Sequence, residues 1–466
     1  MQLGDVKGKR VLVLGLGLHG GGVAVARWLV RHGARVTVSD LKSRRELASS
    51  LKQLKGLPVR YVLGAHPASL LKACDIIIQN PGVPRGLALL RRAKQQGIMV
   101  ENEASLFLKL CPSRLVVGVT GSRGKSTTVS LLGAMLKRWN AHTRVAGNIR
   151  DTVMFDVLDK LTPATPLVLE LSSWHLELVG QHRLKLPFGV VTNVLPDHLN
   201  RYSSFSAYAR AKAALLRYQT NEDAIVLNHD NPITRQFGRK APGQVYWFSL
   251  RTPVVRGAYR QGQVIYWRSH RRERMFKVSD VALKGEHNLA NVLAATAAAR
   301  VMGVPTAHIR HAVRTFRGLH DRLELVGVAR GVEYYNDTTA TSPEATRAAL
   351  RTFAGRRVVL IAGGTDKNLP YADLSADIRR SVKALVLLPG SATVKLQQGL
   401  RGFQSVFLEK NMFQAVKRAQ QLAPEGALVL LSPGAASFGL FTHEFDRGEQ
   451  FKRAVNSLLK RTRRRI

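Results

Sequence analysis

The stretch RLVVGVTGSRGKSTTVSLLGAMLKRW, residues 114–139, predicts a phosphate-binding loop between a strand and a helix. An apolar run ends in a glycine-rich turn, and a segment with helical composition follows Lys125. Glycines let backbone N–H groups approach phosphate oxygens, Lys125 can offset their charge, and the Ser126 hydroxyl can bind Mg²⁺. The usual GxxxxGK[ST] pattern has glycine where this chain has Val119, but the rest of the pattern is present. The predicted nucleotide-binding residues are Gly121, Ser122, Arg123, Gly124, Lys125, Ser126 and Thr127.

The composition indicates a folded protein of several domains. The 466 residues leave room for about three domains. Apolar residues make up 45%, which is enough for sizeable cores. We find no apolar run of about 20 residues, so we expect no membrane span. The two cysteines form no CxxC motif, and the N-terminal segment lacks a signal-peptide pattern, so we expect a cytoplasmic protein.

The charge is strongly positive. There are 71 Lys and Arg residues against 31 Asp and Glu residues, which gives a net charge of +40. The densest basic clusters are residues 268–277 and 460–466. Such a balance favours anionic partners, and it is compatible either with a basic solvated surface or with a polyanion-binding protein on an enzyme scaffold. Aromatic residues are only 7% and no base-reading motif occurs, so we expect no specific nucleic-acid partner.

Strand-like and helix-like runs alternate along the whole chain, which predicts an α/β fold. The pattern restarts after the segment CPS at 111–113 and again after HDRLELVG at 320–327. We therefore predict three domains, which are a Rossmann-like domain over residues 1–112, a central P-loop ATPase domain with a mostly parallel sheet over 113–318, and a second Rossmann-like domain with a basic tail over 319–466.

A second glycine loop lies near the N-terminus. GLGLHG, residues 15–20, forms a GxGxxG pattern between a predicted strand and a predicted helix, and Asp40 ends the next predicted strand. This arrangement is typical of dinucleotide-type sites, because glycines admit phosphate and the acid can bind a ribose or a base. The pattern by itself would suggest a dehydrogenase or a tight turn, but a second nucleotide loop lies downstream.

Two segments that follow strand-like runs carry candidates for magnesium binding. Glu170 lies near the end of the strand-like run PLVLE, and Asp197 and His198 follow the run FGVV. Ligand sites in open α/β sheets gather at the carboxyl ends of strands. Glu170 is also compatible with an ordinary strand-end acid, and His198 with a capping or core histidine.

Eight segments in one order resemble the Mur ligases, the ATP-dependent amino-acid-adding enzymes of peptidoglycan synthesis, and among them the glutamate-adding branch. They are TGSRGKSTT, ELSSWHLE, TNVLPDHLNRY, GEHNLANVLAA, FRGLHDRLE, NDTTATSPEA, GGTDK and LLSPGAASFGLF. The resemblance covers nearly the whole chain and implies a first domain for the UDP substrate, a central ATPase and a third domain for the amino acid. It therefore accounts for both glycine loops. The implied reaction adds D-glutamate to UDP-N-acetylmuramoyl-L-alanine through an acyl phosphate and a tetrahedral intermediate, with release of ADP and phosphate.

The resemblance also implies residue roles. Its catalytic residues would be Lys125, Glu170, His198 and Lys212. Two Mg²⁺ ions would be held by Ser126, Glu170, His198 and a carbamylated Lys212. ATP would further contact Asn288, Asn291, Arg322 and Asp337. The UDP substrate would contact Gly17, Leu18, His19, Asp40, Asn80, Gly82 and Asn148. Glutamate would contact Thr341, Lys367, Ser437 and Phe445.

Some positions depart from the glutamate-adding pattern. Thr339 stands where a lysine is common, Trp174 and His175 replace a Phe-Gln pair, and one extra residue precedes Phe445. These changes leave the phosphate and magnesium residues intact. They keep open a ligase that uses L-glutamate or a folylpolyglutamate-type ligase, although the first loop and Asp40 favour a UDP-sugar substrate. We expect the protein to be a monomer.

Overall fold

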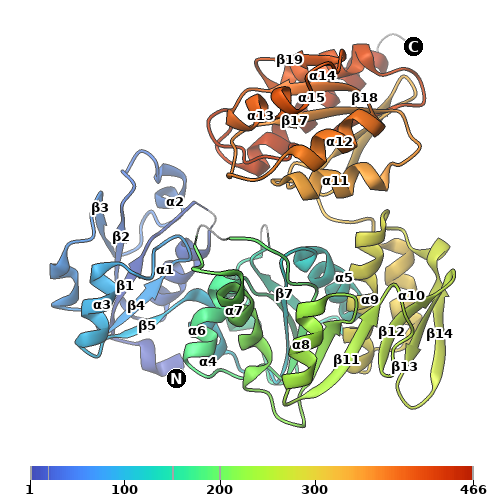
Figure 1. The fold of residues 1–466 in the computed structure, drawn as a ribbon. Coiled ribbons are helices and arrows are strands. Elements are labelled where there is room, and N and C mark those ends of the chain that lie inside the picture. The colour runs from blue at the N-terminus through green and yellow to red at the C-terminus, as the bar shows by residue number, and fades with distance from the viewer. Residues whose placement is uncertain (1–2, 19, 150–151, 199–200, 464–466) are drawn as a thin grey trace. The chain divides into compact units, whose positions relative to one another are not determined.

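The computed structural model describes residues 3–18, 20–149, 152–198 and 201–463, and these form three β-sheets flanked by helices (Figure 1). The chain divides into two compact units, residues 1–282 with 289–316 and residues 283–288 with 317–466. The first two sheets belong to the first unit and the third sheet belongs to the second. The α/β prediction is confirmed, whereas the domain boundaries near 112 and 318 stay a prediction.

The first sheet is parallel and has the order β3-β2-β1-β4-β5. Its strands are β1 (Arg10–Leu14), β2 (Arg35–Asp40), β3 (Val59–Leu63), β4 (Ile76–Gln79) and β5 (Met99–Glu101). The helices of this region are η1 (Leu3–Val6), α1 (Gly21–Arg31), α2 (Ala48–Lys52), η2 (Ala68–Leu71), α3 (Ala88–Gln95) and α4 (Glu103–Leu110). The chain runs from β1 to β2 on one side and later to β4 on the other. The strand order therefore reverses at β1, and the first glycine loop lies at its carboxyl end, where such sheets bind ligands.

The central sheet has nine strands in the order β14-β13-β12-β11-β10-β9-β6-β8-β7. They are β6 (Leu115–Thr120), β7 (Arg144–Gly147), β8 (Pro166–Glu170), β9 (Phe188–Val191), β10 (Ala224–Asn228), β11 (Gln244–Ser249), β12 (Gly257–Gln261), β13 (Val264–Arg268) and β14 (Arg272–Lys277). The pairing is parallel from β7 to β12, and β13 and β14 extend the sheet by antiparallel pairing. β6 lies between β8 and β9, so the segments that follow these three strands lie side by side.

The helices of this part of the chain connect the parallel strands and then lead to the second unit. They are α5 (Lys125–Trp139), η3 (Met154–Asp156), η4 (Leu158–Lys160), α6 (Ser173–Gln181), α7 (Phe205–Arg217), α8 (Pro232–Lys240), η5 (Val278–Asp280), α9 (Glu286–Val301) and α10 (Thr306–Thr315). Buried residues of β1, β2, β4, α1 and α4 form one continuous apolar core with those of β8, β9, η3, η4, α6 and α7. The first two sheets therefore share a core within the first unit.

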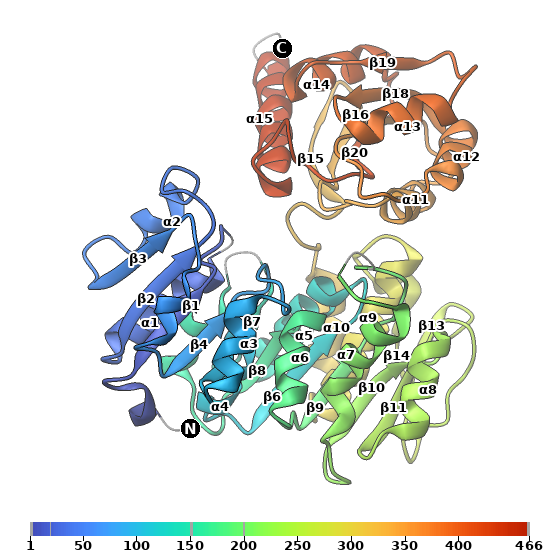
Figure 2. The same ribbon diagram turned by 60° about the vertical axis from the view of Figure 1, so that its left-hand side comes forward.

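The third sheet has the order β15-β16-β20-β17-β18-β19, with an antiparallel β15–β16 pair at one edge. Its strands are β15 (Glu324–Ala329), β16 (Val332–Asn336), β17 (Val358–Gly363), β18 (Val382–Leu388), β19 (Val406–Leu408) and β20 (Leu428–Leu431). Its helices are α11 (Pro343–Thr352), α12 (Ala372–Ser381), α13 (Ser391–Gly399), α14 (Met412–Leu422) and α15 (Glu444–Arg463). Helices α11 to α13 pack on one face and α14 and α15 on the other, as Figure 2 shows, which gives two apolar layers.

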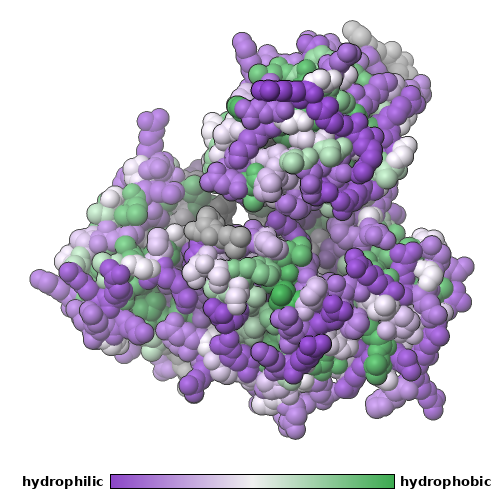
Figure 3. Space-filling model, in the orientation of Figure 1, coloured by the Kyte–Doolittle hydropathy of each residue, from purple (hydrophilic) through white to green (hydrophobic). Residues whose placement is uncertain are grey.

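Hydrophilic side chains dominate the face drawn in Figure 3, and the apolar areas on it are small and separated. No helix among the described residues is both long enough and apolar enough to cross a membrane.

Candidate active site

The nucleotide loop joins β6 to α5 and needs glycine at two positions. Gly124 caps α5 with a φ of 83°, and a side chain on it would collide with the amide of Asn291 from α9. Gly121 has a φ of 154°, and a side chain there would collide with Thr192. Close packing and backbone geometry together therefore require the two glycines that the sequence places in this loop.

The segment that follows β9 holds this loop in place. Thr192 Oγ1 donates a hydrogen bond to the Arg123 carbonyl at 2.6 Å, and the Arg123 N–H donates to Asn193 Oδ1 at 2.9 Å. Ser122 Oγ donates to the Leu195 carbonyl at 3.0 Å and accepts from the Leu195 N–H at 2.9 Å. The backbone of the loop is therefore preorganised, which lowers the cost of ordering it around a phosphate chain.

Two lysines share one carbonyl of the loop. Lys125 Nζ lies 3.0 Å and Lys212 Nζ lies 2.8 Å from the Gly121 oxygen. Lys212 is buried, and burial together with the nearby charge of Lys125 lowers its pKa well below the ordinary lysine value, with Asp197 and Glu170 opposing the shift. Because a lower pKa enlarges the neutral fraction of the amine, Lys212 is chemically distinct from a solvated lysine.

The predicted magnesium ligands come from adjacent elements. Ser126 lies in the first turn of α5, Glu170 ends β8 and is buried, and His198 follows β9. The His198 ring centroid is 6.0 Å from that of Tyr208, and Lys212 Nζ is 4.7 Å from the Tyr208 ring. Among the described residues there is no group of three or more His, Cys, Asp or Glu side chains placed to hold a metal. Of the predicted ligands, only Glu170 and His198 belong to these residue types. The predicted magnesium site therefore also needs the Ser126 hydroxyl and a carbamylated Lys212.

Asp40 organises the first glycine loop. Its Oδ2 accepts hydrogen bonds from the N–H groups of Leu16 at 2.8 Å and Gly17 at 3.2 Å, and its Oδ1 accepts one from Lys42 at 2.9 Å. The carboxylate predicted to contact the UDP substrate therefore also holds the loop after β1. Leu18 is exposed beside it, and predicted residue His19 lies outside the described residues.

The other predicted UDP-substrate residues lie on neighbouring loops. The Gly82 N–H donates to Asn80 Oδ1 at 3.2 Å, and a Cβ built on Gly15 would come within 3.0 Å of the Asn80 Cβ. Asn148 follows β7, and its N–H donates to the Glu170 carbonyl at 3.2 Å. Asn148, a predicted contact of the UDP substrate, therefore lies next to Glu170, a predicted magnesium ligand.

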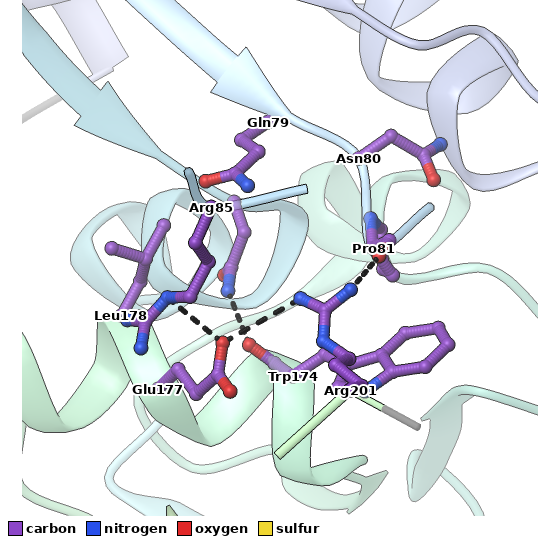
Figure 4. Close-up of a pocket in the computed structure, with 9 residues that line it drawn as sticks. Gln79, Asn80, Pro81, Arg85, Trp174, Glu177, Leu178 and Arg201 are labelled. Carbon is purple, nitrogen blue, oxygen red and sulfur yellow. Dashed lines mark hydrogen bonds and ion pairs between the residues drawn. The ribbon is translucent and has the colours of Figure 1, made fainter. Parts of the chain in front are cut away.

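A small pocket lies between the loop after β4 and helix α6 (Figure 4). Arg201 Nη1 donates to the Pro81 carbonyl at 2.8 Å, and its guanidinium lies 4.5 Å from the Trp174 ring centroid. Glu177 Oε2 is 3.1 Å from Arg85 Nε and 3.7 Å from Arg201 Nη2. The full lining is Gln79, Asn80, Pro81, Arg85, Asn102, Trp174, Glu177, Leu178 and Arg201.

Arg201 was not among the residues singled out from the sequence. It lies three residues after His198, in the segment TNVLPDHLNRY, and that proximity was the available signal. Its contact with Pro81 connects the segment of a predicted magnesium ligand to the loop of predicted substrate residues Asn80 and Gly82.

Asn291 and the other predicted ATP contacts fall in different units. Asn291 lies against Gly124 within the first unit. Asn288, whose Nδ2 donates to the Lys284 carbonyl at 2.8 Å, belongs to the second unit together with exposed Arg322 and buried Asp337.

Asp337 is a buried acid at the end of β16. Its Oδ2 accepts a hydrogen bond from Ser432 Oγ at 2.9 Å and its Oδ1 accepts one from the Leu323 N–H at 3.3 Å. Burial raises the pKa of this carboxyl to about 7, against the opposing effect of these bonds and of Arg322. The group therefore titrates near neutral pH rather than in acid.

The predicted glutamate contacts lie on three loops and one helix of the second unit. Lys367 Nζ donates to Thr341 Oγ1 at 3.0 Å, which brings the loops after β16 and β17 together. Ser437 is buried in the loop after β20. Phe445 lies in the first turn of α15, with its ring centroid 5.9 Å from that of His443.

Models of known protein families match most of this chain. Family models described as Mur ligase MurD-like N-terminal domain, Mur ligase middle domain, and Mur ligase glutamate ligase domain match residues 9–102, 119–299 and 321–434. UDP-N-acetylmuramoylalanine–D-glutamate ligase from Roseiflexus sp. (strain RS-1) is 46% identical over 97% of this chain and 99% of the relative. The ligase of the same name from Acetivibrio thermocellus is 38% identical over 97% of both chains.

Solved structures share the fold. The crystal structure of UDP-N-acetylmuramate-alanine ligase MurC from Thermotoga maritima matches with a TM-score of 0.65 and 19% identity, over 96% of this chain and 99% of the other. A pseudomurein peptide ligase type C from Methanothermus fervidus matches with a TM-score of 0.57 and 18% identity, over 97% of this chain and 99% of the other. The three matching family models and the full-length relatives at 46% and 38% identity place this chain in the Mur ligase family.

Proposed function

We propose that this protein is an ATP-dependent ligase that adds D-glutamate to UDP-N-acetylmuramoyl-L-alanine in the synthesis of peptidoglycan precursors. The observation that carries this proposal is the 46% identity to a D-glutamate ligase along almost the full length of both chains. We further expect a monomer in the cytoplasm.

The proposed chemistry has two stages. The substrate carboxylate attacks the γ-phosphorus of ATP, which forms an acyl phosphate and releases ADP. The amine of D-glutamate then attacks the acyl carbon, and the tetrahedral intermediate loses phosphate and a proton to leave an amide. Activation is necessary because a carboxylate by itself is a poor acylating agent.

The nucleotide loop supplies charge stabilisation for the first stage. Its backbone N–H groups and Lys125 would offset negative charge that develops on the transferred phosphoryl oxygens. The hydrogen bonds from Thr192 and Asn193 to the loop support this role, since they fix these donors before the substrate arrives.

Ser126, Glu170 and His198 fit a role as magnesium ligands. The hydroxyl and carboxylate are oxygen donors of the kind that Mg²⁺ prefers, and their segments follow adjacent strands. Bound Mg²⁺ would neutralise phosphate charge. The fit is improved if Lys212 is carbamylated, because the modification replaces a buried cation with an anion.

The lowered pKa of Lys212 supports its carbamylation. The neutral amine adds to CO₂, a C–N bond forms and one proton is released, which leaves a carbamate anion. Lys125, which shares the Gly121 carbonyl with Lys212, would then face an anion instead of a like charge.

The remaining residues would bind the two other substrates. Asp40 and Asn148 flank the region expected to hold the UDP substrate, together with Gly17, Leu18, His19, Asn80 and Gly82. Asn288, Asn291, Arg322 and Asp337 would complete the ATP site. A dicarboxylate amino acid needs cationic and hydroxyl donors, and Lys367 with Thr341, Ser437 and the region of Phe445 would supply them.

A ligation assay tests the proposal. Purified protein is incubated with ATP, Mg²⁺ and UDP-N-acetylmuramoyl-L-alanine, with D-glutamate and L-glutamate offered separately, and phosphate release and product mass are measured. We expect turnover with D-glutamate only. Turnover with L-glutamate only would contradict the proposed specificity and direct attention to Thr339 and Phe445. Absence of ligation together with tight, salt-sensitive DNA binding would instead favour a polyanion-binding protein.

A further inference from the structure

Arg447, in the first part of α15, is an arginine whose side chain is entirely buried. Its Nε donates to Thr338 Oγ1 at 3.0 Å and its Nη2 donates to the Thr338 carbonyl at 2.8 Å. Its Nη1 donates to the Ala435 carbonyl at 3.1 Å. One planar guanidinium thus connects two loops that are about a hundred residues apart in the sequence.

The acceptors of Arg447 are neutral. Within the described residues its guanidinium donates no hydrogen bond to a carboxylate, and burial lowers its pKa to about 10 against the opposing charge of Glu444. A charged group in such surroundings is costly unless its hydrogen bonds compensate for lost hydration. A neutral side chain of similar volume would avoid this cost, so a purely structural explanation of the arginine is weak.

The two loops held by Arg447 carry the predicted amino-acid contacts. Thr338 belongs to the loop between β16 and α11, residues 337–342, which also carries Thr341. Ala435 belongs to the loop between β20 and α15, residues 432–443, which also carries Ser437.

The segment of Lys367 contacts both loops. Lys367 Nζ bonds Thr341 Oγ1 at 3.0 Å, and Thr365 exchanges two backbone hydrogen bonds of 2.9 Å with Ala436. The Gly434 N–H also donates to the Ala340 carbonyl at 2.9 Å. The spacing of the predicted amino-acid contacts therefore depends on how these two loops are held.

We propose that Arg447 is a positioning residue for the amino-acid substrate, which keeps Thr341 and Ser437 at the spacing that a bound dicarboxylate requires. This inference rests on the proposed ligase function. Arginine suits the role because its donors point in fixed directions within one plane, so it can bond Thr338 twice and Ala435 once. A lysine has a single nitrogen and cannot reproduce this geometry.

The test compares three full-length variants with the wild-type enzyme. Arg447→Lys keeps the charge and removes the planar arrangement of donors. Thr338→Val removes one acceptor and keeps the arginine. Arg453→Lys changes an exposed arginine on the same helix and serves as the matched control. The steady-state KM values for glutamate, ATP and UDP-N-acetylmuramoyl-L-alanine are measured, together with the melting temperature.

We expect Arg447→Lys to raise the KM for glutamate about tenfold or more, as loss of well-made hydrogen bonds to a buried charge predicts. The KM values for ATP and for the UDP substrate should stay within about twofold. Thr338→Val should show a smaller increase in the same KM, and Arg453→Lys should show none. Acyl phosphate formed without glutamate, trapped with hydroxylamine as the hydroxamate, should be unaffected in Arg447→Lys.

Other results would overturn the inference. A lower melting temperature with an unchanged KM for glutamate would show a structural role only. Equal increases in all three KM values, or lost hydroxamate formation, would show a general effect on the active site. If wild-type enzyme uses another amino acid, the proposed function fails, and the KM for that amino acid then decides the role of Arg447.

Discussion

Lys212 shows at the scale of one residue how burial changes chemistry. It is buried beside the nucleotide loop, and its lowered pKa follows from lost hydration and from the charge of Lys125. A lysine kept there as an ordinary cation would repel the cation that the loop already supplies. The proposed conversion of Lys212 to a carbamate would remove that repulsion.

We predict that Lys212→Ala lowers ligase activity about 100-fold or more, because a group that supports a metal site is lost. Bicarbonate should not restore activity, since alanine has no amine, whereas short-chain carboxylates should restore part of it. The control is Arg210→Ala, which changes an exposed residue of the same helix. Full activity of Lys212→Ala would exclude the carbamate role, and the measurement is phosphate release at saturating substrates.

Glu103 predicts a pH dependence of stability. Its carboxyl is buried at the start of α4 and against Gly21, and burial raises its pKa from 4.5 to about 7. The folded protein therefore binds this proton more tightly than the unfolded chain. The free energy of unfolding should fall as the pH rises from about 4.5 to about 7, and the whole effect amounts to up to about 3 kcal/mol.

We predict that Glu103→Gln removes this dependence. The melting temperature of the variant minus that of the wild type should increase between pH 4.5 and pH 8, because only the wild type must ionise a buried acid. The measurement is thermal unfolding at matched ionic strength across that range. A difference that is independent of pH would contradict the assignment. Asp75→Asn offers a comparison of opposite sign in a more acidic range, because the contact with Arg10 lowers the pKa of Asp75 from 3.8 to about 2. The stability that this contact gives should be lost as the pH falls from about 3.8 to about 2, and it should not change between pH 4.5 and pH 8.

At the scale of elements, the segment after β9 links two sites of the first unit. Its first residues bond the nucleotide loop, and Arg201 further along bonds the Pro81 carbonyl in the loop after β4. The stacking of Arg201 on Trp174 of α6 fixes the guanidinium in this position. Trp174 is one of the positions that depart from the usual pattern, and its large ring suits this contact.

We predict that Arg201→Lys raises the KM for the UDP substrate about tenfold, because the bond to Pro81 and the stacking are both weakened. The KM for glutamate should not change. Arg85→Lys is the comparison, since Arg85 lines the same pocket but contacts Glu177 at its rim, and it should change the KM less than about threefold. A KM for the UDP substrate that is unaffected in Arg201→Lys would exclude a role for this connection.

At the scale of the whole molecule, the predicted substrate sites are divided between two units. The nucleotide loop and the UDP-substrate loops belong to the first unit, and the predicted glutamate contacts belong to the second. The amine must reach the acyl phosphate, so the proposed reaction requires the units to come together when substrates are bound.

We predict that an ATP analogue together with the UDP substrate reduces the radius of gyration in solution, as measured by small-angle scattering. Either ligand separately should have a smaller effect. Lys125→Met, which should weaken ATP binding, is the control and should show a reduced response. Unchanged dimensions with all ligands present would contradict ligand-driven closure.

The sequence by itself determined the local elements of the site. Residues 114–139 specify strand, glycine turn and helix because Gly121 and Gly124 meet local backbone requirements that few other residues satisfy. The first glycine loop and Asp40 were predictable for the same reason. The resemblance to the Mur ligases then assigned the remaining segments, since eight motifs occur in one order.

Only the tertiary structure decided which of these segments meet. Lys212 and Lys125 share the Gly121 carbonyl, Arg201 reaches Pro81, and Arg447 joins Thr338 to Ala435. The antiparallel addition of β13 and β14 to the central sheet is likewise a matter of pairing between strands. Hydrophobic periodicity and turn residues predict the local backbone conformation of residues that are close in the sequence. The contacts named above join residues that are far apart in the sequence, so they depend on strand order and on how helices pack against sheets.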